Sequence, residues 1–159
     1  MLMLLFYVGK DIYALNTRQI VEVIPRVILR KVYHAPEYVA GMFNYRGVIV
    51  PAIDLSHLIH GESSRSHLST RIIMVNYFTN NTKRYMGLMA ERVTETLNIP
   101  EQSIKNDPIA LNKNHHYLGE MIVEDKGIIQ QINLDYFLSD SHQNYLIFAE
   151  GDSDNVTQN

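Results

Sequence analysis

Cysteine is absent from this 159-residue chain, which excludes disulfide bridges, thiolate zinc sites and cysteine nucleophiles together. Long hydrophobic runs are absent as well. No run approaches the length of about 20 apolar residues that a membrane-spanning helix needs. The apolar start, residues 1–8, has neither the basic flank nor the small-residue cleavage site of a signal peptide. We therefore expect a soluble, cytoplasmic protein that does not insert directly into a membrane.

Positive charge is scarce and scattered. The formal charge is −3 and the isoelectric point is about 6.1, whereas the recognition of phosphates usually leaves a basic stripe. This argues against nucleic acid as a partner and makes an OB-type nucleic-acid-binding barrel the weaker alternative. The P-loop, the G-x-G-x-x-G fingerprint and the G-x-S-x-G elbow are also missing. We expect neither an enzyme nor a bound cofactor.

A metal site deserves a test because the chain has seven histidines. Asp54, His57 and His60 are spaced i, i+3 and i+6, which on a helix spreads them over about 120°, too wide for all three to reach one ion. His57 and His60 alone lack a third ligand. A metal-dependent enzyme that uses this pair is therefore a disfavoured alternative, and no metal ligand is predicted.

Short apolar segments rich in valine, isoleucine, tyrosine and phenylalanine alternate with turn signals, which is typical of β-strands. Two short helices are predicted, at 54–61 with an Asp54 cap and a closing Gly61, and at 133–140. The fold class that we expect is all-β with a few short helices. The predicted strands are residues 2–8, 12–15, 20–24, 41–45, 48–54, 71–78, 84–90, 92–97, 119–124 and 128–132.

The second half of the sequence repeats the first. The segment that starts at Ala14, ALNTRQIVEVI, matches the segment that starts at Gly87, GLMAERVTETL. Farther along, RGVI from Arg46 matches KGII from Lys126 in the same order. Self-similarity of this kind indicates two related structural units. Small antiparallel sheets must hide their edges, which favours a pair of small barrels.

The domain organisation follows from this repeat. We expect a single domain over residues 1–148, with halves at about 12–60 and 71–139 that are joined by the polar link 60–70. The N- and C-terminal segments of this domain are expected to pack on the two halves. Residues 149–159 are too polar to bury enough surface to offset the entropy of ordering them. They are predicted to form a disordered tail.

Arg46 lies between two apolar runs, and an unpaired arginine inside a core would cost several kcal/mol. One interpretation is a tight hairpin turn in which Gly47 supplies a positive φ. Lys126 and Gly127 occupy the same place in the second half, which supports this interpretation. The other interpretation is that Arg46 meets a partner or an intramolecular carboxylate. The residues alone leave both open.

Glu22 and its counterpart Glu95 fall in the middle of the segments IVEVI and VTETL. Strand alternation puts each glutamate on the face opposite its apolar neighbours. Exposure to solvent explains both residues. A second hypothesis makes the face with Ile20 and Glu22 a contact surface, because a charge beside exposed β-branched residues resembles a protein interface.

Four segments together resemble one known family. GMFNYRGVIVPAIDL, residues 41–55, is similar to the central motif of the CheW family, the coupling proteins of bacterial chemosensory arrays. Residues 6–24, 86–99 and 117–138 resemble the family's opening strands, its second-half strand pair and its closing segment. The resemblance covers about residues 4–139 and is more specific than any single motif.

The resemblance implies two small five-stranded SH3-like β-barrels and no catalysis. It implies two partners, the cytoplasmic tip of a chemoreceptor and the CheW-like regulatory domain of a CheA-type histidine kinase. The function expected is a scaffold that couples receptor state to kinase activity. The output of such a system, whether flagellar swimming, twitching motility or surface sensing through a second messenger, stays open.

The same resemblance assigns residues to partner contact. By position, Arg46 is the motif arginine near the receptor-facing surface and is expected at the junction of the subdomains, framed by Gly41 and Gly47. Ile20 and Glu22 lie on a strand tied to partner contact, and Val93 belongs to the second-half strand near the receptor groove. The chain departs from the family pattern at two places, because Tyr45 stands where leucine is usual, and Ala90 with Glu91 stands where valine followed by aspartate is common.

Overall fold

The computed structural model describes residues 1–64, 68–79, 81–100, 104–105 and 118–134. Regular structure in these residues is nearly all β-strand. All ten predicted strands are confirmed, whereas β9 and a 3₁₀ helix, η1 (Thr17–Gln19), were not predicted because so few residues show no periodicity. The strands are β1 (Leu2–Val8), β2 (Asp11–Asn16), β3 (Ile20–Pro25), β4 (Val39–Tyr45), β5 (Val48–Asp54), β6 (Arg71–Thr79), β7 (Thr82–Ala90), β8 (Arg92–Asn98), β9 (Ile104–Lys105), β10 (Leu118–Glu124) and β11 (Gly127–Ile132).

The predicted helix at 54–61 is α1 (Leu55–His60), and its two ends have the predicted caps. The Asp54 carboxylate accepts hydrogen bonds from the backbone N–H groups of Ser56 and His57, at 3.1 and 3.4 Å. Gly61 ends the helix in the left-handed conformation, at φ 77°. The second predicted helix, 133–140, lies almost entirely outside the described residues.

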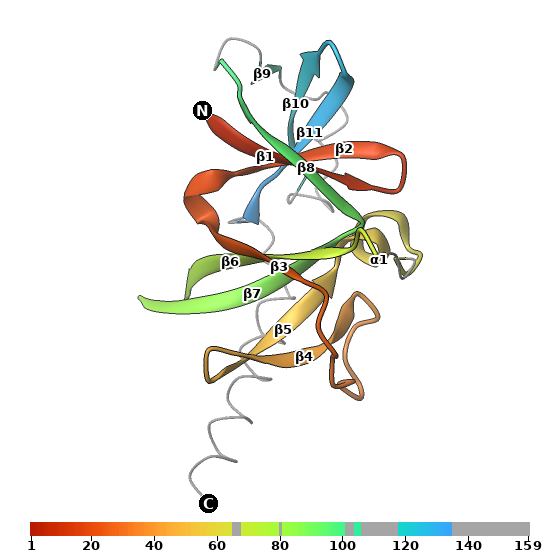
Figure 1. Ribbon diagram of the computed structural model, residues 1–159, viewed down its shortest axis with the longest axis vertical. Helices are drawn as coiled ribbons and strands as arrows, with labels where there is room; N and C mark the ends of the chain where they lie inside the picture. Colours follow the sequence, from red (N-terminus) through yellow and green to blue (C-terminus); the bar gives the residue numbers. More distant parts are fainter. Residues whose placement is uncertain (65–67, 80, 101–103, 106–117, 135–159) are drawn as a thin grey trace, which may run out of the picture.

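The strands form two sheets, stacked one above the other in Figure 1. One has five strands in the order β3-β6-β7-β5-β4, and the other has the order β8-β1-β2-β11-β10-β9. The first sheet is built from residues 20–90 and the second from residues 2–16 and 92–132. The sheets therefore do not coincide with the sequence halves 12–60 and 71–139, since each half contributes strands to both sheets.

The pairing of the strands confirms the internal duplication. The repeat relates β3 to β8, β7 to β2, β5 to β11 and β4 to β10, and these strands take equivalent places in the two orders. β6 and β1 fill the remaining place, and β9 is added at the end of the second sheet. The register agrees as well: Ala52 pairs with Gly87 in the first sheet and Gln131 pairs with Ala14 in the second, both between parallel strands. The alignment of Ala14 with Gly87, made on the sequence, is thus a structural equivalence.

The buried apolar residues form three clusters. One belongs to the first sheet and includes Phe43, Val50 and Ile72, and one belongs to the second and includes Ile122 and Ile129. The third draws residues from both sheets, so we call it the junction core. Its buried members include Leu4, Phe6, Val8, Leu15, Ile53, Ile73, Val75 and Leu88.

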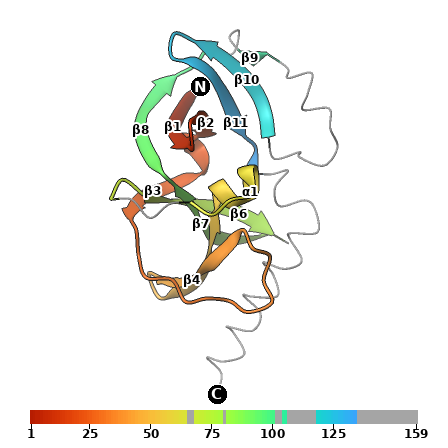
Figure 2. The ribbon, with the colours of Figure 1, turned by 90° about the vertical axis from the view of Figure 1, so that its right-hand side faces the viewer.

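The expected fold class is confirmed, since the described residues form two small β-units with a single short α-helix. The second sheet is strongly curved, as the arc of β8 around β1 and β2 shows (Figure 2). Among the helices of the described residues, none has the length and apolar character needed to cross a membrane.

Candidate functional site

The Arg46–Gly47 pair forms the two-residue turn between β4 and β5. Both residues have positive φ, 52° and 85°, and Tyr45 pairs with Val48 directly before and after them. Positive φ at both central positions is the pattern of a type I′ hairpin turn. The Asn44 side-chain oxygen accepts a hydrogen bond of 2.8 Å from the N–H of Gly47. The tight hairpin predicted for this site is confirmed.

The Arg46 side chain meets an intramolecular carboxylate. Its guanidinium donates to Oε1 of Glu22 on β3 at 3.1 Å and lies 5.1 Å from the centre of the Tyr45 ring. The two side chains of the ion pair are 63% and 37% exposed, so solvent screens the pair and its worth is about 1 kcal/mol or less. Arg46 is therefore balanced in charge and still accessible to a partner.

The location of this ion pair differs from the prediction in one respect. Arg46 was expected at the junction of the two subdomains. Glu22 and Arg46 instead belong to the same sheet, Glu22 on the strand at one end of its order and Arg46 in the hairpin at the other. The contact brings the two ends of one curved sheet together.

The side chain of Tyr45 contacts both members of the ion pair. Its ring is buried, packs edge-on against Tyr85 at 5.6 Å, and its hydroxyl donates a short hydrogen bond to Oε1 of Glu22. Burial, and next the hydrogen bond to the Glu22 carboxylate, raise the pKa of Tyr45 to about 12. One carboxylate oxygen thus receives both the tyrosine and the arginine.

The raised pKa of Tyr45 predicts a pH effect with a definite sign. Between about pH 10 and 12 the folded protein keeps the phenol proton that the unfolded chain releases, so this contribution to stability is complete below pH 10 and is lost as pH rises through 12. Urea unfolding from pH 9 to 12 should show a steeper loss for the parent than for Tyr45→Phe. Equal slopes would contradict the assignment.

The second half of the chain contains a counterpart of the ion pair. Lys126, in the turn between β10 and β11, contacts Glu95 on β8. Both residues correspond to Arg46 and Glu22 in the sequence repeat. An ion pair between a hairpin turn and the far strand of the same sheet is therefore a feature of the duplicated architecture. Arg46 and Lys126 therefore have the same structural role, each in its own sheet.

Ile20 and Glu22 do not share a face, contrary to the prediction. The register between β3 and β6 shifts between them, so Ile20 lies opposite Val75 of the junction core and Glu22 opposite Met74 of the first sheet's own core. Such a β-bulge inserts one extra residue, here Val21, and reverses the alternation beyond it. Only Glu22 turns toward Arg46.

Val93 is the counterpart of Ile20 and has the same surroundings. The register between β1 and β8 shifts at Thr94, as it does at Val21 in the first half. Val93 and Ile20 are both half-buried and both pack against the junction core. The two residues flank the contact between the sheets from equivalent strands.

Gly41 fits its place because a side chain there would collide with the segment beside β4. A Cβ atom would come within 2.7 Å of the carbonyl oxygen of Arg30 and 2.8 Å of Cβ of Leu29. We expect Gly41→Ala to lower the free energy of unfolding by about 1–3 kcal/mol. Gly119→Ala is the matched control, because its Cβ would come no closer than 3.3 Å to any atom, the nearest being the Gln131 carbonyl oxygen. Urea denaturation measures both, and equal losses would refute the explanation.

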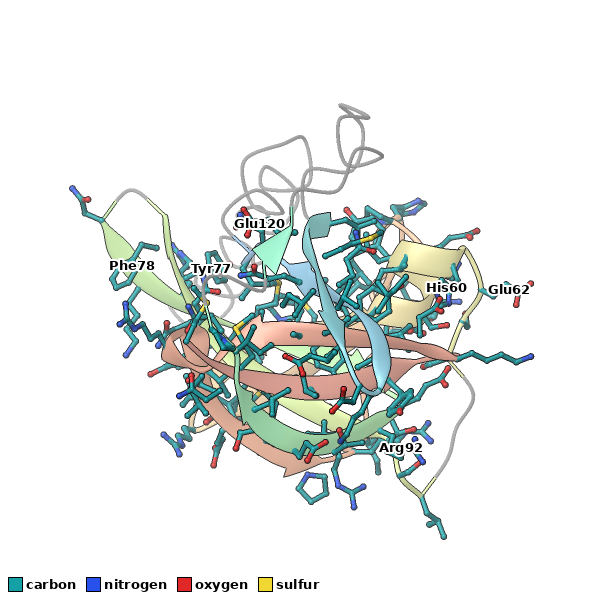
Figure 3. All side chains as sticks on the ribbon, turned by 90° about the horizontal axis from the view of Figure 1, so that it is seen from above. His60, Glu62, Tyr77, Phe78, Arg92 and Glu120 are labelled. Atoms are coloured by element: carbon teal, nitrogen blue, oxygen red, sulfur yellow. The ribbon has the colours of Figure 1, made fainter. Side chains whose placement is uncertain are left out.

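The histidines of the disfavoured metal hypothesis point to separate partners. His57 contacts Glu37 at 3.1 Å, His60 contacts Asp11 at 3.4 Å, and Asp54 caps the helix. Figure 3 shows His60 on α1 at the edge of the molecule. Across the part of the chain that the structure describes, no group of three potential ligands lies close enough to hold a metal ion.

Sequence reasoning missed two parts of the site. Tyr45 was noted only as a departure from leucine, although a tyrosine next to the turn arginine offers a hydroxyl donor beside a cation. The ion pair of Lys126 with Glu95 was also missed, although both residues had been aligned with Arg46 and Glu22. Pairing the aligned charges across the two halves would have found it.

Comparison with known proteins decides the family. The family model of the CheW-like domain matches residues 2–142. The chain belongs to the CheW-like domain family. Among solved structures, the crystal structure of the scaffolding protein TtCheW from Thermoanaerobacter tengcongensis superposes with a TM-score of 0.76 at 26% identity, over 89% of each chain.

Curated relatives carry the same family name. "Chemotaxis protein CheW" of Helicobacter pylori is 27% identical over 111 residues, 70% of this chain and 65% of that protein. "Probable chemotaxis protein CheW" of Rhizobium etli is 23% identical over 137 residues, 86% of each chain. The match to the Helicobacter protein, like that to "Chemotaxis protein CheW" of Klebsiella aerogenes at 61%, spans somewhat less than two thirds of the relative's length.

Proposed function

We propose that this CheW-family chain is a non-enzymatic adaptor that couples chemoreceptors to a CheA-type histidine kinase. The observation that carries the proposal is the family match over residues 2–142, supported by the fold match to a scaffolding protein over 89% of both chains. An adaptor needs exposed surfaces and no catalytic constellation, and the geometry around Arg46 meets that requirement.

Signal transfer by such an adaptor requires no chemistry of its own. A receptor state that favours one arrangement of the adaptor and kinase shifts the population toward it by its differential affinity. The Glu22–Arg46 pair offers an exposed, charged contact on one sheet. Ile20 and Val93, with the junction core between them, offer an apolar contact at the boundary of the sheets. In this proposal Gly41 and Gly47 hold the backbone that presents Arg46.

The first experiment is a titration of the purified chain against the regulatory domain of a CheA-type kinase from the same genome. We expect saturable binding at micromolar concentrations or better, as for interfaces of transient size that act in a multivalent lattice. A receptor fragment added to the complex should then change kinase activity. Absence of binding at high concentration would withdraw the coupling function and leave the fold intact.

A further inference from the structure

The segment of residues 26–31, which follows β3, lies along the outer side of β4, and we call it the basic edge. Arg30 pairs with Met42 through two backbone hydrogen bonds of 2.8 Å, one in each direction. β4 is the last strand in its sheet order, so Arg30 adds a single bridge at the outer edge of the sheet. The missing side chain of Gly41 permits the approach, because a Cβ there would touch Arg30.

Side chains alternate along the basic edge as they do along a strand. Val27 and Leu29 are half-buried against the core of the first sheet, whereas Arg26, Ile28 and Arg30 are exposed. Ile28 is 97% exposed, between the two arginines. The outer face thus shows a cation, an aliphatic side chain and a cation at every second residue, the spacing that a neighbouring strand can match.

The charge of this region is opposite to that of the whole chain. No acidic residue occurs from Arg26 to Pro36, a stretch that also contains Lys31 and His34, although the formal charge of the protein is −3. Two open grooves, of about 610 and 720 Å³, run beside the segment and share Leu29, Ala40 and Asp54 as lining residues. The Asp54 carboxylate is engaged by the start of α1 and by Ser64.

The backbone of the basic edge has an open side. Successive N–H and C=O groups of an extended chain point to alternate sides, so those of Leu29 point away from β4 when those of Arg30 point toward it. Among the described residues, the Leu29 groups have no backbone hydrogen-bond partner. An open, extended backbone edge is what a peptide strand recognises, and it can be reached along a groove.

We propose that the basic edge binds an extended acidic peptide segment of a partner protein by strand addition. The segment would carry an acidic, an apolar and an acidic side chain at alternate positions, to face Arg26, Ile28 and Arg30. Main-chain hydrogen bonds supply part of the affinity, and the alternation supplies the specificity. A flat lipid surface fits less well, because it cannot pair with the backbone or enter the grooves.

The test is a fluorescence anisotropy titration of the full chain with a labelled nine-residue peptide in which glutamate, valine and glutamate alternate with threonine. We expect saturable binding that weakens at least tenfold in Ile28→Asp and in Arg30→Glu. Lys10→Glu and Leu68→Asp are the matched controls, exposed elsewhere on the protein, and should change the dissociation constant less than twofold. All four side chains are exposed, so the fold should survive.

Three further probes separate strand addition from simple charge attraction. A peptide of the same composition with its two glutamates adjacent should bind at least tenfold more weakly, and N-methylation of alternate backbone nitrogens should abolish binding in one of the two possible sets. Equal binding of the rearranged and N-methylated peptides would overturn the proposal. So would tighter, Ile28-dependent binding to phosphatidylglycerol vesicles. Neither kinase nor receptor is used, so the result is independent of the coupling function.

Discussion

Phe6→Ala is expected to lower the free energy of unfolding by about 3–5 kcal/mol. Phe6 lies on β1, is fully buried in the junction core and stacks on Tyr13 with 6.2 Å between ring centres. Removing its ring deletes contacts with both sheets at once, and the surrounding strands are tied by backbone hydrogen bonds and cannot collapse into the cavity. The loss should be read from urea denaturation of the purified variant.

The control for this prediction is Phe78→Ala. Phe78 is 70% exposed and projects from the end of the β6–β7 hairpin (Figure 3), so its removal should change stability by about 0.5 kcal/mol or less. Because the junction core is common to both sheets, Phe6→Ala should shift one cooperative transition, equally by fluorescence and by circular dichroism. Two separate transitions would mean that the sheets unfold independently and that the junction contributes little.

The strands were predictable because their signal is local. Alternation of apolar and polar residues, β-branched residues and turn glycines locate ten strands without knowledge of their neighbours. The repeat was predictable as well, since related segments keep related patterns. The turn at Arg46 was predictable from a local signal too, because glycine after a basic residue between two apolar runs indicates a hairpin.

The pairing of the strands was not predictable from those signals. β3 follows β2 in the chain but joins the sheet of β6, and β8 joins the sheet of β1 in the same way. Both exchanges depend on pairs of residues that lie more than 45 positions apart in the sequence, which local periodicity does not encode. The bulge at Val21 was also hidden, since its one-residue shift leaves the composition of the segment unchanged. It separates Ile20 from Glu22 and thereby changes the site.

The duplicated ion pairs bear on why Arg46 is present. Lys126 with Glu95 forms the same contact without the family's motif arginine, so an arginine is not required to bring the hairpin to the far strand. Arginine differs from lysine by a planar set of donors that binds a carboxylate in two contacts and stacks on aromatic rings. At Arg46 one donor is used by Glu22 and the ring of Tyr45 lies beneath, which orients the guanidinium for a second acceptor.

Exchange of the two charges should separate the structural role of Arg46 from its role in binding. Arg46→Glu and Glu22→Arg each place like charges together, and we expect each to weaken binding of the kinase regulatory domain or of the receptor tip by at least tenfold. Stability should fall by only about 1 kcal/mol for Arg46→Glu, because the pair is exposed. Glu22→Arg should lower the stability by more than Arg46→Glu, since the substitution also removes the acceptor of the Tyr45 hydroxyl.

The double variant decides between the two interpretations. It restores opposite charges between β3 and the turn, so stability should recover in part, but it presents a reversed charge pattern to a partner, so binding should stay weak. Full recovery of binding would assign Arg46 to the turn alone. The matched exchange of Lys126 with Glu95 repeats the structural change in the other sheet and should leave the Arg46-dependent binding unchanged. An equal loss of affinity in both exchanges would instead mean that binding depends on the intact fold of the two sheets and not on Arg46 itself.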